Sequence, residues 1–208
     1  MTTSILKTEK YTERDNRLPE SGRHILAHFD DDSIVVYQAY RPAIGHYAAS
    51  HGYFGGPFSF SRMTWIKPNF LWMMYRSKWG TKIGQKVILA ITLKRNFFDK
   101  VVAQAVPALF RESNFKNELD WKKSLAKNPI RVQWDPDRNP YGHAISRRAI
   151  QLGLKGDIVK EYAQDATLQI EDISEFVQKQ YRHVQSQNLQ KLIMPVEHVY
   201  VADSISRK

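Results

Sequence analysis

Residues 86–93 read KVILAITL, and this run indicates the fold class. Its β-branched and aliphatic side chains, uninterrupted by turn formers, are typical of a buried strand. A second run, Ser33–Tyr40 (SIVVYQAY), predicts another strand because it is rich in β-branched and aromatic residues. Helical patterns separate such strands along the chain. We therefore expect one α+β domain over residues 33–208, with a small split or mixed β-sheet flanked by helices.

The other elements are predicted from caps, prolines and turn formers. Helices are expected over residues 42–53, 69–77, 97–110, 117–126, 146–152, 157–162 and 172–192, and short strands over 130–134, 167–170 and 196–201. Asn96 is expected to cap the third of these helices, and Asp172 with Glu175 has capping-box spacing for the last. Residues 135–141 predict a turn. Residues 1–32 are expected to be an irregular lead-in with one helical turn near residues 24–29.

Composition excludes several classes of protein. Hydrophobic residues make up 42% of the 208-residue chain, enough for a core, and the chain has no cysteine. Disulfide scaffolds, thiolate zinc sites and cysteine nucleophiles are therefore excluded. No apolar run approaches the ~18 residues of a membrane span, and the polar start lacks the apolar stretch of a secretory signal. We expect a cytoplasmic protein without membrane association.

The positive charge is concentrated in the middle of the chain. The net charge is +10, and residues 62–148 carry 18 Lys and Arg against 6 Asp and Glu, whereas the remainder carries 13 against 15. Such a concentration attracts polyanions. We expect a nucleic acid or nucleotide as partner, although a solubilising surface or a face that docks an acidic protein would also carry this charge.

Residues 62–79, RMTWIKPNFLWMMYRSKW, interleave aromatic and basic side chains. On a helix from Asn69, the side chains of Trp72, Arg76 and Trp79 share one stripe, where an indole can stack on a planar ring while a guanidinium holds phosphate. The apolar residues 70, 71, 73 and 74 are assigned to the core. The candidates for binding a cofactor in this segment are Arg62, Lys67, Trp72, Tyr75 and Arg76.

Two further groups of polar residues are candidates. Tyr40 and Arg41 lie at a predicted strand-to-helix turn, a place suited to binding phosphate or ribose, with a surface salt bridge as the alternative. Strand alternation places Arg131, Gln133 and Asp135 on one polar face. Arg131 is a catalytic candidate, and Gln133 is a candidate for cofactor binding.

Later in the chain, His143 and Arg147 could together handle proton transfer and phosphate charge, so His143 is a catalytic candidate and Arg147 a cofactor-binding one. Glu171 could stabilise a developing oxocarbenium ion, and the alternative is that it caps the following helix. Histidine pairs such as His24 and His28 lack a third ligand at metal-site spacing, so no metal is expected.

Several common enzyme motifs are missing from the sequence. There is no Gly-rich dinucleotide fingerprint and no phosphate-cradling P-loop, which argues against a classical Rossmann enzyme or a P-loop ATPase. Gly-x-Ser-x-Gly and His-Glu-x-x-His are also missing, which lowers the odds of an α/β-hydrolase or a zincin.

The chain resembles an uncharacterised family called domain of unknown function 4291. The resemblance rests on VVYQAYRPAIG at residues 35–45, MTWIKPNFLWMMYRSKWGTK at 63–82, IRVQWDPDR at 130–138 and RRAIQLGLKG at 147–156. The second block is highly specific. The family implies no function.

In layout the chain is also similar to the ADP-ribosyltransferase fold, which binds NAD without a Gly-rich fingerprint. That resemblance implies NAD as cofactor, with Arg41 in the early NAD-binding position and Glu171 as the late acid. The chain departs from the pattern because the central strand has no Ser-Thr-Ser block. The RNA 2′-phosphotransferase branch of that fold relies on arginines and a histidine, for which His143 and Arg147 are possible matches.

The leading hypothesis is an enzyme that acts on nucleic acid or nucleotides at an arginine-rich, metal-free site. It would transfer ADP-ribose from NAD or carry out related phosphate–ribose chemistry. The alternative is a non-catalytic module that binds nucleic acid through a basic aromatic surface.

Overall fold

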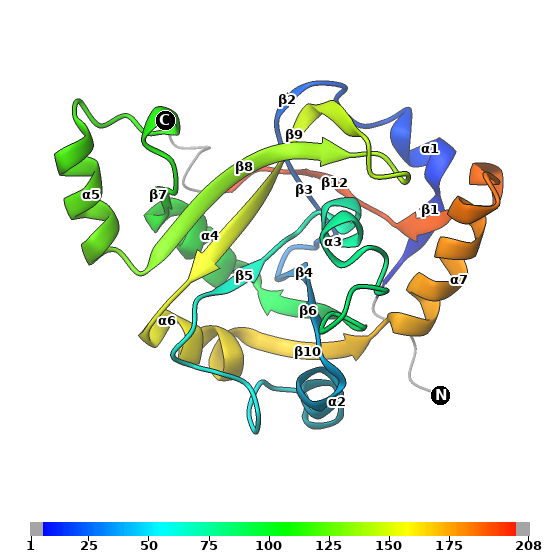
Figure 1. The fold of residues 1–208 in the computed structure, drawn as a ribbon, viewed down its shortest axis with the longest axis horizontal. Coiled ribbons are helices and arrows are strands. Elements are labelled where there is room, and N and C mark those ends of the chain that lie inside the picture. The colour runs from blue at the N-terminus through cyan, green and yellow to red at the C-terminus, as the bar shows by residue number, and fades with distance from the viewer. Residues whose placement is uncertain (1–5, 203–208) are drawn as a thin grey trace.

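Strand β6 (Val87–Lys94) is the centre of a three-stranded antiparallel sheet in the computed structural model, which describes residues 6–202 (Figure 1). Its neighbours are β4 (Ser33–Tyr40) and β10 (Thr167–Asp172). The two strands expected from the apolar runs at residues 86–93 and 33–40 are therefore confirmed as adjacent strands.

The second sheet is built on the long antiparallel pair β8 (Ile130–Arg138) and β9 (Ala144–Leu154), which passes over the first sheet in Figure 1. The short strands β2 (Gly22–Arg23) and β5 (Thr64–Ile66) pair with β9, and β7 (Val106–Pro107) runs parallel to β8. A bridge joins the two sheets where the amide of Tyr37 donates to the carbonyl of Lys67 at 2.7 Å. The mixed α+β architecture is as expected.

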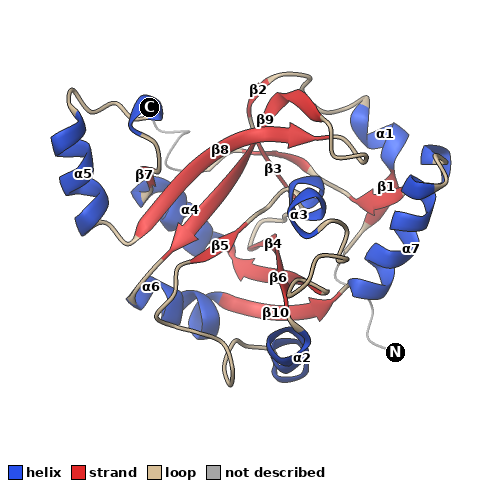
Figure 2. Ribbon diagram, viewed as in Figure 1, coloured by secondary structure: helices blue, strands red, loops and turns tan. Residues whose placement is uncertain are grey.

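The remaining elements surround these sheets (Figure 2). Two more strand pairs form, β1 (Thr8–Lys10) with β11 (Ile193–Pro195) and β3 (Ile25–Ala27) with β12 (His198–Tyr200). The helices are α1 (Tyr11–Asp15), α2 (Pro42–His51), α3 (Phe70–Ser77), α4 (Arg95–Gln104), α5 (Glu118–Lys127), α6 (Asp157–Lys160), which continues as a π-helix (Glu161–Ala166), and α7 (Ser174–Gln185). Within residues 6–202, no helix is both long and apolar enough to cross a membrane.

The three-stranded sheet is covered on both faces along β4 and β6, which is why these two strands are nearly continuous apolar runs, whereas the edge strand β10 is mostly polar and has one buried residue. One face, with Val36 and Leu89, packs against the second sheet, α4 and α6. The other face, with Tyr37 and Ala90, is covered by α3 and α7. Residues 70, 71, 73 and 74 are buried in this second cluster, which confirms their assignment to the core.

Two expectations about secondary structure are wrong. The helix expected over residues 146–152 is part of β9, because pairing with β8 on one side and with β5 on the other overrides the helical propensity of its side chains. The lead-in expected to be irregular contains β1, α1, β2 and β3 within its described residues 6–32, and its expected helical turn is instead β3. Residues 1–5 of the lead-in lie outside the described part.

Other elements differ from their expected bounds or caps. The strand expected over residues 130–134 continues to Arg138, which shortens the expected turn. Helix α4 begins at Arg95, so Asn96 does not cap it, and it ends at Gln104 rather than at residue 110. Helix α7 follows Ile173, whose side chain makes no capping bond, and it ends at Gln185. Asn117 does cap α5, where its side chain accepts from the amide of Asp120 at 2.9 Å.

The start of α3 is held by a network of buried polar groups. The amide of Phe70 donates to Glu197 Oε1 at 2.7 Å, and Glu197 forms an ion pair with Arg14 in which both side chains are fully buried. The side chain of Asn69 caps the helix by accepting from the amide of Trp72 at 2.7 Å. A carboxylate is favourable at this position because the N-terminus of a helix carries partial positive charge.

We expect Glu197→Gln to lower the free energy of unfolding by about 3–5 kcal/mol, because it leaves the Arg14 guanidinium buried without a counter-charge. Urea denaturation measures the change. The double variant Arg14→Met with Glu197→Gln should recover most of the loss, since no buried charge remains. Lys122→Met, which breaks an exposed pair with Glu118, is the control. If Glu197→Gln were as stable as Lys122→Met, the assignment of Arg14 and Glu197 as a stabilising buried ion pair would be contradicted.

Candidate functional site

A cavity of about 750 Å³ opens where β4 ends, between β5, the last turn of α3 and the β8–β9 pair. Its cationic side chains are Arg41, Arg62, Lys67 and Arg76. None of the residues that line it, all within the described part of the chain, is acidic. Tyr40, Phe58 and Trp65 add aromatic surface. Its volume is in the range of small-molecule sites.

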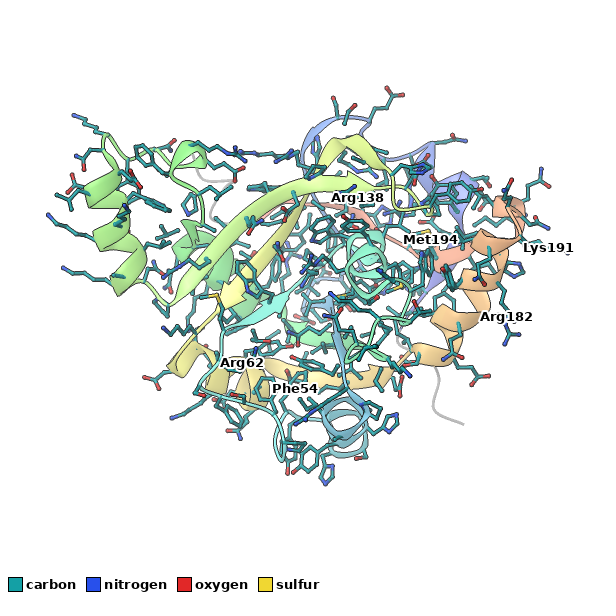
Figure 3. The ribbon with its side chains drawn as sticks, in the orientation of Figure 1. Phe54, Arg62, Arg138, Arg182, Lys191 and Met194 are labelled. Carbon is teal, nitrogen blue, oxygen red and sulfur yellow. The ribbon has the colours of Figure 1, made fainter. Side chains whose placement is uncertain are left out.

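The three arginines of this cavity come from different elements. Arg41 is the N-cap residue of α2, Arg62 lies on the segment that leads into β5 (Figure 3), and Arg76 lies in the last turn of α3. None of their guanidinium groups makes a hydrogen bond or an ion pair with any residue between 6 and 202. Three exposed guanidinium groups around one cavity make a site for an anion with several charged oxygens.

Lys67 differs from these arginines because it is buried. Its Nζ donates to the carbonyl of Trp65 at 3.2 Å, and its main chain is fixed by the bridge to Tyr37. Burial, together with the charge of Arg76, lowers the pKa of Lys67 to about 7, although the carboxylate of Asp135 opposes the shift. The cavity therefore presents an amine that is partly neutral near physiological pH.

The floor of the cavity is a hydrogen-bonded cluster around Gln38. The amide nitrogen of Gln38 donates to Thr64 Oγ1 at 2.7 Å and to the carbonyl of Trp65 at 3.0 Å, while its amide oxygen accepts from the hydroxyls of Tyr40 and Tyr162. Burial raises the pKa of the Tyr40 hydroxyl well above its usual range. These bonds fix the position of β4 relative to β5.

The wall on the second sheet is polar but uncharged. Gln133 and Gln151 both line the cavity and face each other across β8 and β9. Their amide nitrogens donate to the two oxygens of Asp135, at 2.8 Å and 2.7 Å. The carboxylate of Asp135 is thereby satisfied by two amides, and it is not among the residues that line the cavity.

The structure brings together half of the twelve candidate residues. The six that line this cavity are Tyr40, Arg41, Arg62, Lys67, Arg76 and Gln133. They come from the end of β4, the two flanks of β5, the last turn of α3 and strand β8. The other six lie elsewhere.

Trp72 and Tyr75 lie on a different side of α3 from this cavity. Trp72 is buried, and its ring stacks on that of Tyr75 at 5.3 Å between centroids. The guanidinium of Arg138 lies over the Tyr75 ring, 4.0 Å from its centroid. The stripe of Trp72, Arg76 and Trp79 expected from helical spacing is therefore divided: Arg76 lines the first cavity, Trp72 is packed inside, and Trp79 borders a second cavity. Tyr75 borders this second cavity too.

Arg131, His143 and Arg147 line neither of these two cavities. The guanidinium of Arg131 donates to the carbonyls of Leu125 and Asn128 at the end of α5. His143 is exposed in the turn between β8 and β9, and Arg147 is buried in an ion pair with Asp137 at 2.8 Å. Arg131 and Arg147 therefore serve internal contacts, and neither of the two cavities brings these three side chains together.

Glu171 is also separated from the cationic cavity. It pairs with Ala90, on the sheet face that α3 and α7 cover, whereas Gln38 pairs with Leu89 and points to the opposite face. Glu171 lines a smaller cavity of about 350 Å³ together with Glu175 and Lys179. The late acid expected beside Arg41 is therefore not there. The carboxylate of Asp172, not of Glu171, accepts from the amide of Ser174 at the start of α7.

Four uncharged residues of the cavity were not among the candidates predicted from the sequence. Gln38, Thr64, Trp65 and Gln151 are strand residues within the family's sequence blocks, but no catalytic or binding motif marks them. The signal that was available is their position, since Gln38 interrupts an apolar strand and lies two residues before Tyr40. Within residues 6–202, no group of three or more His, Cys, Asp and Glu side chains is arranged to hold a metal ion.

The sequence matches a family model described as Domain of unknown function (DUF4291) over residues 24–200. That match covers most of the chain, and the chain belongs to this family. A search among curated proteins gave no match. The matched region includes every residue that lines the cationic cavity.

The lowered pKa of Lys67 predicts a specific dependence of stability on pH. The folded-state pKa, about 7, lies below the ordinary value of 10.5, so between these values the unfolded chain binds more protons and stability rises with pH. The cost of burying Lys67 is greatest below pH 7. We expect Lys67→Met to stabilise the protein at pH 6 by about 4 kcal/mol more than at pH 10.

Urea denaturation of both proteins at the two pH values measures this difference. Lys86→Met, which removes an exposed lysine before β6, is the control and should change stability similarly at both. A Lys67→Met effect that is also the same at pH 6 and pH 10 would show that Lys67 is charged throughout this range.

Proposed function

We propose that the cationic cavity binds the phosphates of a nucleotide and that the protein is an enzyme of phosphate–ribose chemistry, with NAD as the donor to test first. The observation that carries the proposal is the set of three arginines, Arg41, Arg62 and Arg76, which face one cavity without a protein counter-ion in the described chain. Like charges gathered in this way repel one another, and a polyanionic ligand relieves the repulsion.

The position of Arg41 supports an anion over a neutral ligand. Arg41 precedes Pro42 at the start of α2, where the helix already has partial positive charge. A guanidinium there is unfavourable unless an anion lies nearby. The aromatic rings of Tyr40, Phe58 and Trp65 supply flat surface for a base or a nicotinamide.

Lys67 supports catalysis because its amine is partly neutral near pH 7. In ADP-ribosyl transfer, an oxygen of the acceptor forms a bond to the ribose C1′ of NAD as the bond from C1′ to nicotinamide breaks. Nicotinamide leaves as a neutral molecule. If the acceptor is a hydroxyl, its proton passes to Lys67. The chemistry would depend on cations and this amine, since Glu171 lies on the other sheet face.

The lack of a carboxylate among the lining residues favours a second candidate, which is binding without catalysis. An oxocarbenium ion is positive, and no lining group carries negative charge to stabilise it. The protein would then be a module that grips nucleotides or nucleic acid through the same arginines. Both candidates predict phosphate binding in the cavity, and only the first predicts a covalent change in the ligand.

The reaction is tested by incubating the protein with NAD and RNA or DNA and measuring release of nicotinamide. We expect release with wild-type protein, and a rate that falls at least tenfold in Lys67→Met, as is typical for loss of a proton-transfer group. If NAD binds but no nicotinamide is released under any condition, the protein is instead the non-catalytic binding module.

Phosphate binding is tested separately by calorimetric titration with NAD. We expect Arg62→Ala to weaken binding about tenfold or more, the usual effect of losing a hydrogen bond to a charged group. Arg182→Ala is the matched control, because Arg182 is exposed on α7, away from Arg62 in Figure 3. Equal affinities for the two variants would contradict the proposed site.

The same titration also reports the charge of Lys67. A bound anion should raise the pKa of Lys67, so at pH 8 binding should take up a fraction of a proton per molecule, and the amine that stays neutral is the form that accepts the proton of the acceptor hydroxyl. Proton uptake is measured by repeating the titration in buffers of different ionisation enthalpy. The phosphates of NAD that would contact the site do not titrate at this pH. Lys67→Met should bind without uptake, and wild-type binding without uptake would contradict contact between Lys67 and the anion.

A further inference from the structure

A second cavity, of about 570 Å³, shares Arg76 with the cationic cavity. Its walls are aromatic and basic. The rings of Tyr75, Trp79, Tyr141 and Tyr181 line it, together with Lys78 and Lys82. None of its lining residues, which all belong to the described chain, is acidic. It therefore combines planar apolar surface with positive charge, as sites for single-stranded nucleic acid do.

The aromatic walls of this second cavity are fixed in place. Trp79 stacks on Tyr181 with centroids 5.7 Å apart, and its indole nitrogen donates to the carbonyl of Pro140 at 3.2 Å. Tyr75 stacks on the Trp72 ring, and the Arg138 guanidinium contacts both rings, 4.0 Å from the Tyr75 centroid and 5.8 Å from the Trp72 centroid. Fixed rings lose little conformational entropy when a ligand stacks on them.

Two of these rings remain available to a ligand. Tyr75 is 38% exposed and Tyr141 is 43% exposed, although both belong to a cavity wall. The adjoining Gly142 adopts φ +85°, and a Cβ there would lie 3.4 Å from the Tyr75 ring. The turn that carries Tyr141 thus approaches α3 closely, with the two tyrosines on the same cavity.

The loop between α3 and β6 lies along both cavities. Lys82 lines the second cavity and Gly84 lines the first, so Ile83 stands at the boundary between them. Ile83 is 92% exposed, an unusual state for a large apolar side chain. Proteins that bind nucleic acid insert such apolar side chains between neighbouring bases.

We infer that the second cavity holds a second nucleoside, joined through phosphate at Arg76 to the nucleoside in the first cavity. This deepens, and rests on, the proposed function, because it makes the ligand two nucleoside units rather than one. The shared chemistry is a phosphate flanked by two planar groups. A free dinucleotide such as NAD and two consecutive nucleotides of a single strand both provide it.

The inference is tested by calorimetric titration with three ligands: AMP, NAD and the dinucleotide pApA. We expect at least one of the two-unit ligands to bind about tenfold more tightly than AMP, the gain typical of one additional stacked base. A gain with NAD alone assigns a free dinucleotide as ligand, and a gain with pApA assigns a nucleic acid strand.

This gain in affinity over AMP should depend on side chains of the second cavity and not on those of the first. Tyr141→Ala and Ile83→Ala should each reduce it about fivefold or more while leaving the affinity for AMP unchanged. Tyr53→Ala is the matched control, because Tyr53 is 40% exposed and lines neither cavity. Arg62→Ala, in the first cavity, should weaken the binding of all three ligands.

The outcomes separate this inference from the proposed function. If AMP binds and both two-unit ligands bind no more tightly, the second cavity holds no nucleoside, and the proposed function stands. A gain that survives Tyr141→Ala and Ile83→Ala likewise overturns the inference. If none of the three ligands binds, the proposed function itself fails.

Discussion

Helix α3 begins on a buried carboxylate, and the functional part of the molecule depends on that contact. Glu197 comes from the last part of the described chain, Arg14 comes from the first helix, and the amide of Phe70 lies between them in sequence. Removing two charges from water is costly, so such a pair is stable only where further hydrogen bonds satisfy it. Here the free amide at the start of α3 is one of these partners. Arg14 from α1 and Glu197 from the segment between β11 and β12 thereby help to fix the residue at which α3 starts.

From this fixed start, α3 and the segment before it supply groups to both cavities. Lys67 lies three residues before the helix, held by its bridge to β4, and Arg76 lies in the last turn. Buried Phe70 and Met74 anchor the helix against the three-stranded sheet. Positioning thus comes from the core, whereas the cations at either end of the helix are the groups that we propose to bind the ligand. A single short element explains why aromatic, apolar and basic residues alternate so densely over residues 62–79.

What could be predicted from the sequence was mostly local. The run KVILAITL predicted the central strand because its apolar residues follow one another without a turn former. Tyr40 and Arg41 lie at the strand-to-helix turn that Pro42 indicates. Arg62, Lys67 and Arg76 lie within one short segment, and they do line one cavity. The helix expected over residues 146–152 failed because its strand form depends on partners far away in the chain.

The misplaced site residues needed information that a single sequence does not contain. Glu171 falls on the wrong sheet face, and only the register with Ala90 decides that. Arg147 resembles a phosphate ligand until Asp137, across the β8–β9 pair, is seen to neutralise it. Gln38 belongs to the site because Thr64 and Tyr162 converge on it. In each case a tertiary contact determines whether a polar side chain stabilises the fold or faces the ligand.

The central claim is that the unpaired arginines hold phosphate between two cavities that meet at Arg76. A crystal structure of the protein soaked with NAD, and a second one soaked with pApA, test it most directly. The claim predicts phosphate oxygens within hydrogen-bonding distance of Arg76 and of Arg41 or Arg62, with one planar group in each cavity. A ligand bound elsewhere, or cavities that stay free of both ligands when the protein is saturated in solution, would contradict it.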